Sequence, residues 1–66
     1  MEPIESIEEK LLQEAVENGR EVKIICINGH QTPAQIVDFD YEAIVAKADG
    51  KTWMVYRHAV STIVFD

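Results

Sequence analysis

Apolar residues in the first part of the chain recur every three or four positions, which is the spacing of one face of an α-helix. This face comprises Ile4, Ile7, Leu11, Leu12, Ala15 and Val16. The pattern predicts one amphipathic helix over residues 4–18. Ser6 with Glu9 fits a capping box at the helix start, although Pro3 would equally open the helix a turn earlier. Asn18-Gly19 predicts the helix end, because both residue types tolerate the left-handed conformation.

From residue 21 the apolar positions alternate with polar ones, which is typical of β-strands. We expect strands at 21–28, 34–40, 43–46, 52–56 and 60–65. Asn28-Gly29 is a strong hairpin signal, and Gly50 supplies a second tight turn. The fold class predicted is mainly β, a small barrel of five bent antiparallel strands capped by the N-terminal helix, because closure removes exposed strand edges. We expect a single domain over residues 1–66, with the barrel over 21–65.

The short length of the chain limits what one copy can bury. A domain of 66 residues buries only about 60% of the surface of its unfolded chain, so a lone copy would be marginally stable. Cys26 is the only cysteine, which excludes an internal disulfide and any Cys-rich zinc site. Self-assembly is therefore the expected source of additional stability. Cys26 itself lies in an alternating strand and is expected to be a small core residue.

The charge balance narrows the range of functions. The formal net charge is −6, with seven Glu among residues 1–21, which argues against a broad basic surface for duplex nucleic acid. The acidic N-terminus lacks the layout of a signal peptide, and the longest apolar run, 24–27, is too short for a membrane span. We expect a cytoplasmic protein with no membrane partner. No catalytic, phosphate-loop or metal-ligand spacing is present, so neither catalysis, a cofactor nor a metal is expected.

Several short strings carry a resemblance to a known family. They are ING at 27–29, QI at 35–36, FD at 39–40 and, above all, VYRHAVST at 55–62. With the order of the predicted elements, they resemble the bacterial Sm-like proteins, and specifically the Hfq family of RNA chaperones, over about residues 6–65. The resemblance implies the Sm barrel and a homo-oligomeric ring, a homohexamer, in which the fourth strand of one chain pairs with the fifth strand of the next.

The same resemblance implies a binding site for single-stranded, uridine-rich RNA at the pore of the ring. Arg57 and His58, preceded by Tyr56, would face the pore, so that copies of a modest local charge converge on an anionic strand. Arg57 stands where the family usually has Lys, and presents a planar fork in place of a point charge. Without the family match, Arg57-His58 would be interpreted as a polar turn between two strands.

Two acidic residues depart from the family at this site. Glu42 occupies the position of an aromatic residue that stacks on uridine, and Tyr41, one residue earlier, is a candidate substitute. Strand alternation predicts that the Tyr41 side chain points elsewhere. Glu8 replaces a Gln that reads a base in the family, but a carboxylate in the first helical turn is also favoured by the helix dipole alone.

The opposite face of such rings binds purine-rich RNA. Ile25 replaces the aromatic residue of the family there, so this face is a weaker prediction. The residues assigned to this second RNA site are Ile25, Gly29, His30, Gln31 and Thr32.

Two residues concern the curvature of the second strand. Ala34 stands where the family prefers Gly, and Pro33 beside it lacks the N–H group that would donate a hydrogen bond to the neighbouring strand, so the curvature is in question. Trp53, in the fourth strand, is expected to pack in the barrel or between subunits.

Two functions follow from these observations. The first is an Hfq-like, ring-forming protein that binds single-stranded RNA in post-transcriptional regulation. The second is a divergent Sm-like assembly module that has weak or no RNA binding and engages protein partners. Glu8, Glu42 and the acidic helix motivate the second, since six times −6 gives a hexamer a formal charge of −36.

Overall fold

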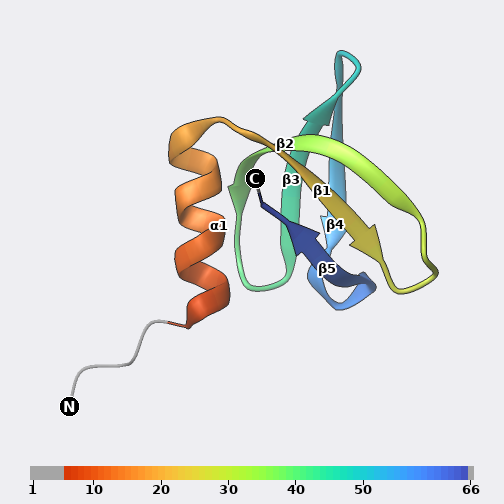
Figure 1. Ribbon diagram of the computed structural model, residues 1–66, viewed down its shortest axis with the longest axis horizontal. Coiled ribbons are helices and arrows are strands. Elements are labelled where there is room, and N and C mark those ends of the chain that lie inside the picture. The colour runs from red at the N-terminus through yellow and green to blue at the C-terminus, as the bar shows by residue number, and fades with distance from the viewer. Residues whose placement is uncertain (1–5, 66) are drawn as a thin grey trace.

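A computed structural model describes residues 6–65 as one helix followed by a five-stranded antiparallel sheet (Figure 1). Helix α1 spans Ile7–Asn18, and the strands are β1 (Glu21–Cys26), β2 (Gln31–Phe39), β3 (Ala43–Ala48), β4 (Lys51–Tyr56) and β5 (Val60–Val64). A short 3₁₀ turn, η1 (Arg57–Ala59), joins β4 to β5. The strand order is β4-β3-β2-β1-β5, so β4 and β5 are the two edges of the sheet. The predicted fold class, an N-terminal helix and five bent antiparallel strands, is confirmed. Within one chain, however, the sheet is open, so the expected removal of strand edges by closure does not occur, because β4 and β5 do not pair with each other.

The ends of α1 follow the capping signals in the sequence. The Ser6 hydroxyl oxygen accepts a hydrogen bond from the backbone N–H of Glu9 at 3.0 Å. Gly19 has a φ of 62° and its N–H donates to the carbonyl oxygen of Ala15 at 3.1 Å. A residue with a β-carbon would be strained at this φ, so glycine suits the position. The Ser6 cap is confirmed, whereas the first part of the predicted helix, with Pro3, lies outside the described residues.

Both predicted tight turns are present. Asn28 accepts a hydrogen bond through Oδ1 from the N–H of His30 at 2.9 Å, and Gly29 has a φ of 88°. Asp49 and Gly50 both have positive φ, 52° and 74°, as the twist of a two-residue hairpin requires. Because the first turn is tight, Ile25 pairs with Gln31 and β2 begins three residues before the predicted start at 34.

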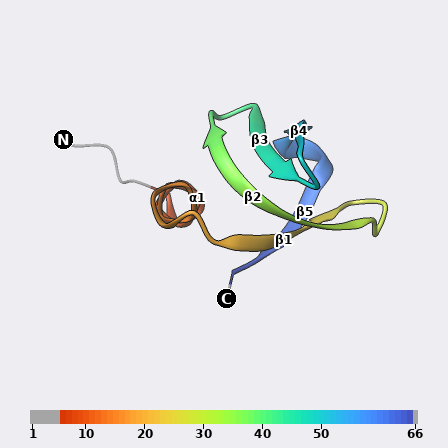
Figure 2. The same ribbon diagram turned by 90° about the horizontal axis from the view of Figure 1, so that it is seen from above.

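The bend of β2 comes from a bulge. In the β2–β3 pairing, Ile36 lies opposite Ala46 and Asp38 lies opposite Val45, so Val37 is an extra residue on β2. Such an insertion bends its strand and increases its twist. Pro33 precedes the first β2–β3 pair, Gln35 with Lys47, so its missing N–H costs no bond in that ladder. Figure 2 shows the resulting sheet curled into an arc, with α1 at one side. The presence of Ala34 therefore does not prevent the curvature.

The core lies between α1 and the sheet, and its buried residues come from α1, β1, β2 and β3. Leu12, Ile36 and Ile44 are at most 1% exposed. The helix packs on the sheet through Leu12 and Ala15, whereas Ile7, on the same apolar face, is 79% exposed. Cys26 is only half-buried, so its assignment to the core was wrong. No helix among residues 6–65 is long and apolar enough to cross a membrane. The buried residues are Leu12, Ala15, Val22, Ile24, Ala34, Ile36, Ile44 and Ala46.

Replacing Leu12 with alanine is expected to detach α1 from the sheet. Deletion of a buried leucine side chain costs about 2–5 kcal/mol, from lost transfer energy and the cavity left behind. Urea unfolding at fixed protein concentration measures this loss. The control is Ile7→Ala on the same helix, which should change stability by less than about 0.5 kcal/mol because the side chain is exposed. Equal losses for the two variants would contradict the packing described here.

Candidate functional site

The turn η1 is held in place by the backbones of two other segments. The N–H of Arg57 donates to the carbonyl oxygen of Glu42 at 2.9 Å, and the N–H of Ile27 donates to the carbonyl oxygen of Ala59 at 2.8 Å. The turn therefore lies between the β2–β3 loop and the end of β1. Its three residues follow one edge strand and precede the other.

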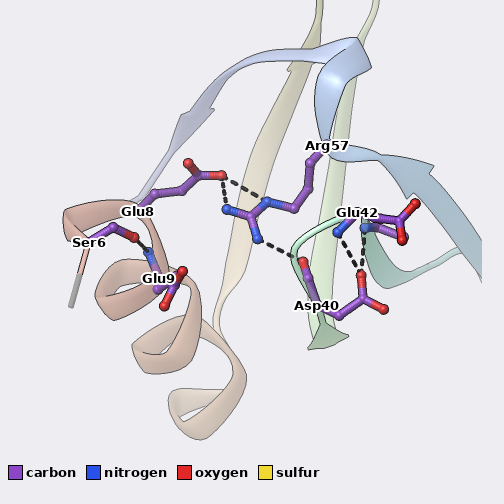
Figure 3. Close-up of polar contacts among 7 residues, drawn as sticks. Ser6, Glu8, Glu9, Asp40, Glu42 and Arg57 are labelled. Atoms are coloured by element: carbon purple, nitrogen blue, oxygen red, sulfur yellow. Dashed lines mark hydrogen bonds and ion pairs between the residues drawn. The ribbon is translucent and has the colours of Figure 1, made fainter. Parts of the chain in front are cut away.

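The Arg57 guanidinium links this turn to the start of α1 (Figure 3). Its Nε donates to Glu8 Oε1 at 2.9 Å, and its Nη2 forms an ion pair with the same oxygen. Its Nη1 donates to the carbonyl oxygen of Asp40 at 2.7 Å. All three guanidinium nitrogens thus have partners within the chain. The Arg57 side chain is 13% exposed, whereas the Glu8 side chain is 61% exposed.

Asp40 shapes the β2–β3 loop on the other side of Arg57. Its Oδ1 accepts hydrogen bonds from the N–H groups of Glu42 and Ala43, both at 2.8 Å. These two bonds, with the nearby positive charge of Arg57, lower the pKa of the Asp40 carboxyl below its ordinary value of 3.8. The ionised carboxylate therefore holds the loop in the shape that presents the Asp40 carbonyl oxygen to Arg57.

Aromatic rings flank the guanidinium in the sequence. Tyr56 and His58 stack on each other, with ring centroids 5.5 Å apart and an interplanar angle of 23°. Tyr56 is 52% exposed and His58 is also exposed. Tyr41, in the bend between β2 and β3, is 85% exposed. Flat exposed rings next to a cation are the groups with which proteins hold single-stranded nucleic acid.

A groove of about 360 Å³ runs between α1 and β5 beside these residues. Its polar lining includes Glu8, Arg57, Ser61 and Thr62, and its apolar lining includes Leu11, Ile63 and Phe65. The exposure of Leu11 on α1 is explained by its position in this groove. β5, which contributes several residues to the groove, is an edge strand with one neighbour, β1.

The residues predicted for the second RNA site lie around the β1–β2 hairpin. His30 and Thr32 line a small pocket of about 70 Å³ together with Cys26 and Trp53, which is 42% exposed. The Ile25 side chain is half-buried, and Gly29 and Gln31 are exposed. Among residues 6–65, no group of three or more His, Cys, Asp or Glu side chains is arranged to hold a metal ion.

Comparisons with known proteins agree on one family. The family described as "Hfq protein" matches residues 7–66. An RNA-binding protein Hfq of Desulforamulus reducens is 34% identical over 58 residues, which are 88% of this chain and 72% of that protein. The RNA-binding protein Hfq of Bacillus subtilis is 31% identical over 62 residues, 94% of this chain and 84% of that protein.

A solved structure agrees with these sequence matches. It is a 1.55 Å crystal structure of the pleiotropic translational regulator Hfq, with a TM-score of 0.88 and 30% identity, and the match covers 91% of this chain and all of that one. The chain belongs to the Hfq family. The resemblance carried by the strings at 27–29 and 55–62 is thereby confirmed.

Within this Hfq-family fold, several of the residues predicted for the pore face lie around η1, some through side-chain contacts and others through their backbone. Glu8 and Arg57 are in direct contact, and Glu42 takes part through its backbone. Tyr41 lies in a bend and not within a strand, so strand alternation does not determine where its side chain points.

Sequence reasoning missed two features of this site. The contact between Glu8 and Arg57 joins residues 49 positions apart, and no local signal announces it. The role of Asp40 in fixing the loop had a signal, since an Asp directly after a strand commonly accepts bonds from backbone N–H groups two or three residues ahead. In this chain those groups belong to Glu42 and Ala43.

Substitution of Asp40 by asparagine should lower stability at neutral pH but not in strong acid. Because the folded pKa lies below 3.8, the stabilisation is complete above that value and is lost as the pH falls through the folded pKa. Asparagine keeps an oxygen acceptor but not the charge that strengthens the two bonds. Urea midpoints of both proteins from pH 7 to pH 2 measure the effect.

The matched control is Asp49→Asn, which removes the same charge at an exposed turn where asparagine also tolerates positive φ. The gap between wild type and Asp40→Asn should close on acidification, and the control should show a smaller gap throughout. A gap for Asp40→Asn that is constant with pH would argue against the ionised carboxylate as the cause.

Proposed function

We propose that this protein binds single-stranded RNA at the η1 turn as part of a ring of identical chains and acts in post-transcriptional regulation in the cytoplasm. The observation that carries the proposal is the exposed Tyr56–His58 stack beside Arg57, at the turn between the two edge strands of an Hfq-family fold. The relatives cited above are named as RNA-binding proteins.

The chemistry at η1 suits a single strand and not a duplex. Unstacked bases need flat partners, which Tyr56, His58 and Tyr41 offer through exposed rings. The phosphates of the RNA need a cation, which Arg57 supplies. A single local cation of this kind is compatible with a protein whose net charge is −6. The preference proposed here is for uridine-rich RNA, as the family resemblance implies.

Ring formation is supported by the two unpaired edges of the sheet. Strands β4 and β5 each have one neighbour within the chain, so each has backbone groups available to another copy. Met54 on β4 is 58% exposed and Val64 on β5 is 44% exposed. Pairing β4 of one chain with β5 of the next would cover both, and a closed ring, proposed as a homohexamer, would gather the η1 turns around a pore.

The hairpin residues form a second, weaker proposal. Ile25, Gly29, His30, Gln31 and Thr32 would contact purine-rich RNA. His30 and Gln31 have exposed side chains with hydrogen-bonding groups, whereas Ile25 is half-buried and offers no stacking surface. Oligoadenine is therefore expected to bind more weakly than oligouridine.

A labelled short oligouridine should bind saturably in fluorescence anisotropy at low salt, with affinity falling as salt rises because phosphate contacts release counterions. His58→Ala should weaken this binding at least about fivefold, since base–aromatic stacking contributes about 1–3 kcal/mol per base.

The control for His58→Ala is Lys51→Ala, which removes a full positive charge at the exposed first residue of β4, at the opposite end of that strand from η1. Its effect should stay within about twofold at near-physiological salt, because exposed charges more than about 8 Å apart are largely screened there. Failure of oligouridine to bind even at low salt would refute the proposed function. Equal losses for the two variants would place the binding site elsewhere.

Native mass spectrometry should show six chains of 7.5 kDa in one assembly. Met54→Lys, on the β4 edge, should shift the population to smaller species by placing a charge in the proposed seam. Ile27→Lys is the matched control, since Ile27 is 70% exposed at the β1–β2 turn and lies on neither edge strand. A wild type that stays monomeric at micromolar concentration would exclude the ring.

A further inference from the structure

The positive charge of Arg57 is already engaged inside the chain. Both the Nε and Nη2 nitrogens face the same Glu8 oxygen, and Nη1 faces the carbonyl oxygen of Asp40. A phosphate oxygen that approached the guanidinium would meet these partners first. Direct contact between Arg57 and RNA therefore requires the release of an existing bond.

Glu8 is the partner that competes most directly with a phosphate. Its carboxylate carries a full negative charge and takes the paired Nε–Nη2 edge of the guanidinium, the edge that also suits two phosphate oxygens. The Asp40 carbonyl is neutral and occupies Nη1 alone. The Asp40 carboxylate is committed to the N–H groups of Glu42 and Ala43.

The contact is open to solvent on the Glu8 side. The Glu8 side chain is 61% exposed, although that of Arg57 is only 13% exposed. Ion pairs at the surface typically shift an equilibrium constant by only about 1.5- to 5-fold. A phosphate that took the place of Glu8 would have to break the Glu8–Arg57 ion pair, which weakens RNA binding by the factor given above. An RNA that contacts several copies of the chain in a ring would lose this factor at each copy.

We propose that Glu8 is an internal competitor of RNA, a carboxylate that occupies the Arg57 guanidinium and so sets the affinity of the η1 site below what its cation would give. This inference rests on the proposed function. In the free protein Arg57 joins α1 to the η1 turn, and RNA must exchange with Glu8 to use its charge. Glu8 is thus a residue that tunes affinity and does not contact the base.

The test is oligouridine binding by Glu8→Gln. Glutamine has the same shape and keeps an oxygen for Arg57, but it lacks the charge that opposes a phosphate. Affinity at near-physiological salt is expected to rise about threefold to tenfold. This range corresponds to the loss of the Glu8–Arg57 ion pair in a few of the chains that the RNA contacts, each contributing the factor given above. The plot of log affinity against log salt should become steeper, by about 0.7 for each additional phosphate that the protein neutralises on a single strand.

The matched control is Glu9→Gln. Glu9 lies on the same helical turn and is exposed, and in Figure 3 its carboxylate lies apart from the guanidinium. The substitution Glu9→Gln removes the same charge from each chain, but at a position that does not contact Arg57. Its effect on affinity is expected to stay below about twofold, with little change in the salt slope. Equal gains for the two variants would overturn the inference, because they would reflect net charge alone.

A double-mutant cycle with Arg57→Ala isolates the interaction between Glu8 and Arg57. When Arg57 is present, Glu8→Gln should raise affinity severalfold, and when Arg57 is alanine the same change should have an effect below about twofold. Equal gains in both backgrounds would mean that Glu8 does not act through Arg57. Unfolding midpoints of all variants, measured in parallel, test whether changes in affinity follow changes in stability.

The outcomes separate this inference from the proposed function. Oligouridine binding by wild type with no gain in Glu8→Gln leaves the proposed function intact and refutes the competitor. Binding by Glu8→Gln but not by wild type supports the competitor and refutes RNA binding as the function of the natural protein. Absence of binding by both proteins refutes both.

Discussion

The arrangement of the whole sheet depends on the bend in β2. This strand pairs with β1 on one side and β3 on the other, and its Ile36 side chain is fully buried. The extra residue at Val37 lets one strand belong to both halves of a curled sheet. A flat sheet of this length would leave one apolar face in water. The bend allows 66 residues to form a core with a single helix.

The same bend determines where the functional groups lie. The β2–β3 loop that follows it supplies the Glu42 and Asp40 carbonyl oxygens that hold the backbone and guanidinium of Arg57. The start of α1 supplies Glu8 from the far end of the chain. The η1 turn is therefore fixed from several sides, while Tyr56, just before it, and His58, in its middle, remain exposed. A rigid turn with exposed rings loses less conformational entropy on binding than a flexible loop would.

Most of the fold was predictable, because its signals are local. The Ser6 cap, the Gly19 end and the Asn28-Gly29 turn each depend on residues close together in the chain, and all three are present in the structure. The bulge at Val37 has no such signal, since it arises from the pairing of two strands around a shared core. Periodicity along α1 likewise identifies an apolar face but not which of its residues the sheet covers, and Ile7 on that face is exposed.

The site was predictable only in part, and the missing part changes its electrostatics. The sequence indicates Arg57 as a focused cation in an acidic chain, and the net charge of −6 suggests a general repulsion of RNA. At physiological salt, however, exposed charges separated by more than about 8 Å are largely screened, so most of the acidic helix acts only weakly on a strand bound at η1. Glu8 differs from the other acidic residues in the first helical turn because it touches the guanidinium itself. If RNA binds at η1 as proposed, Glu8 therefore opposes it through direct contact with Arg57, and the distant acidic residues contribute much less.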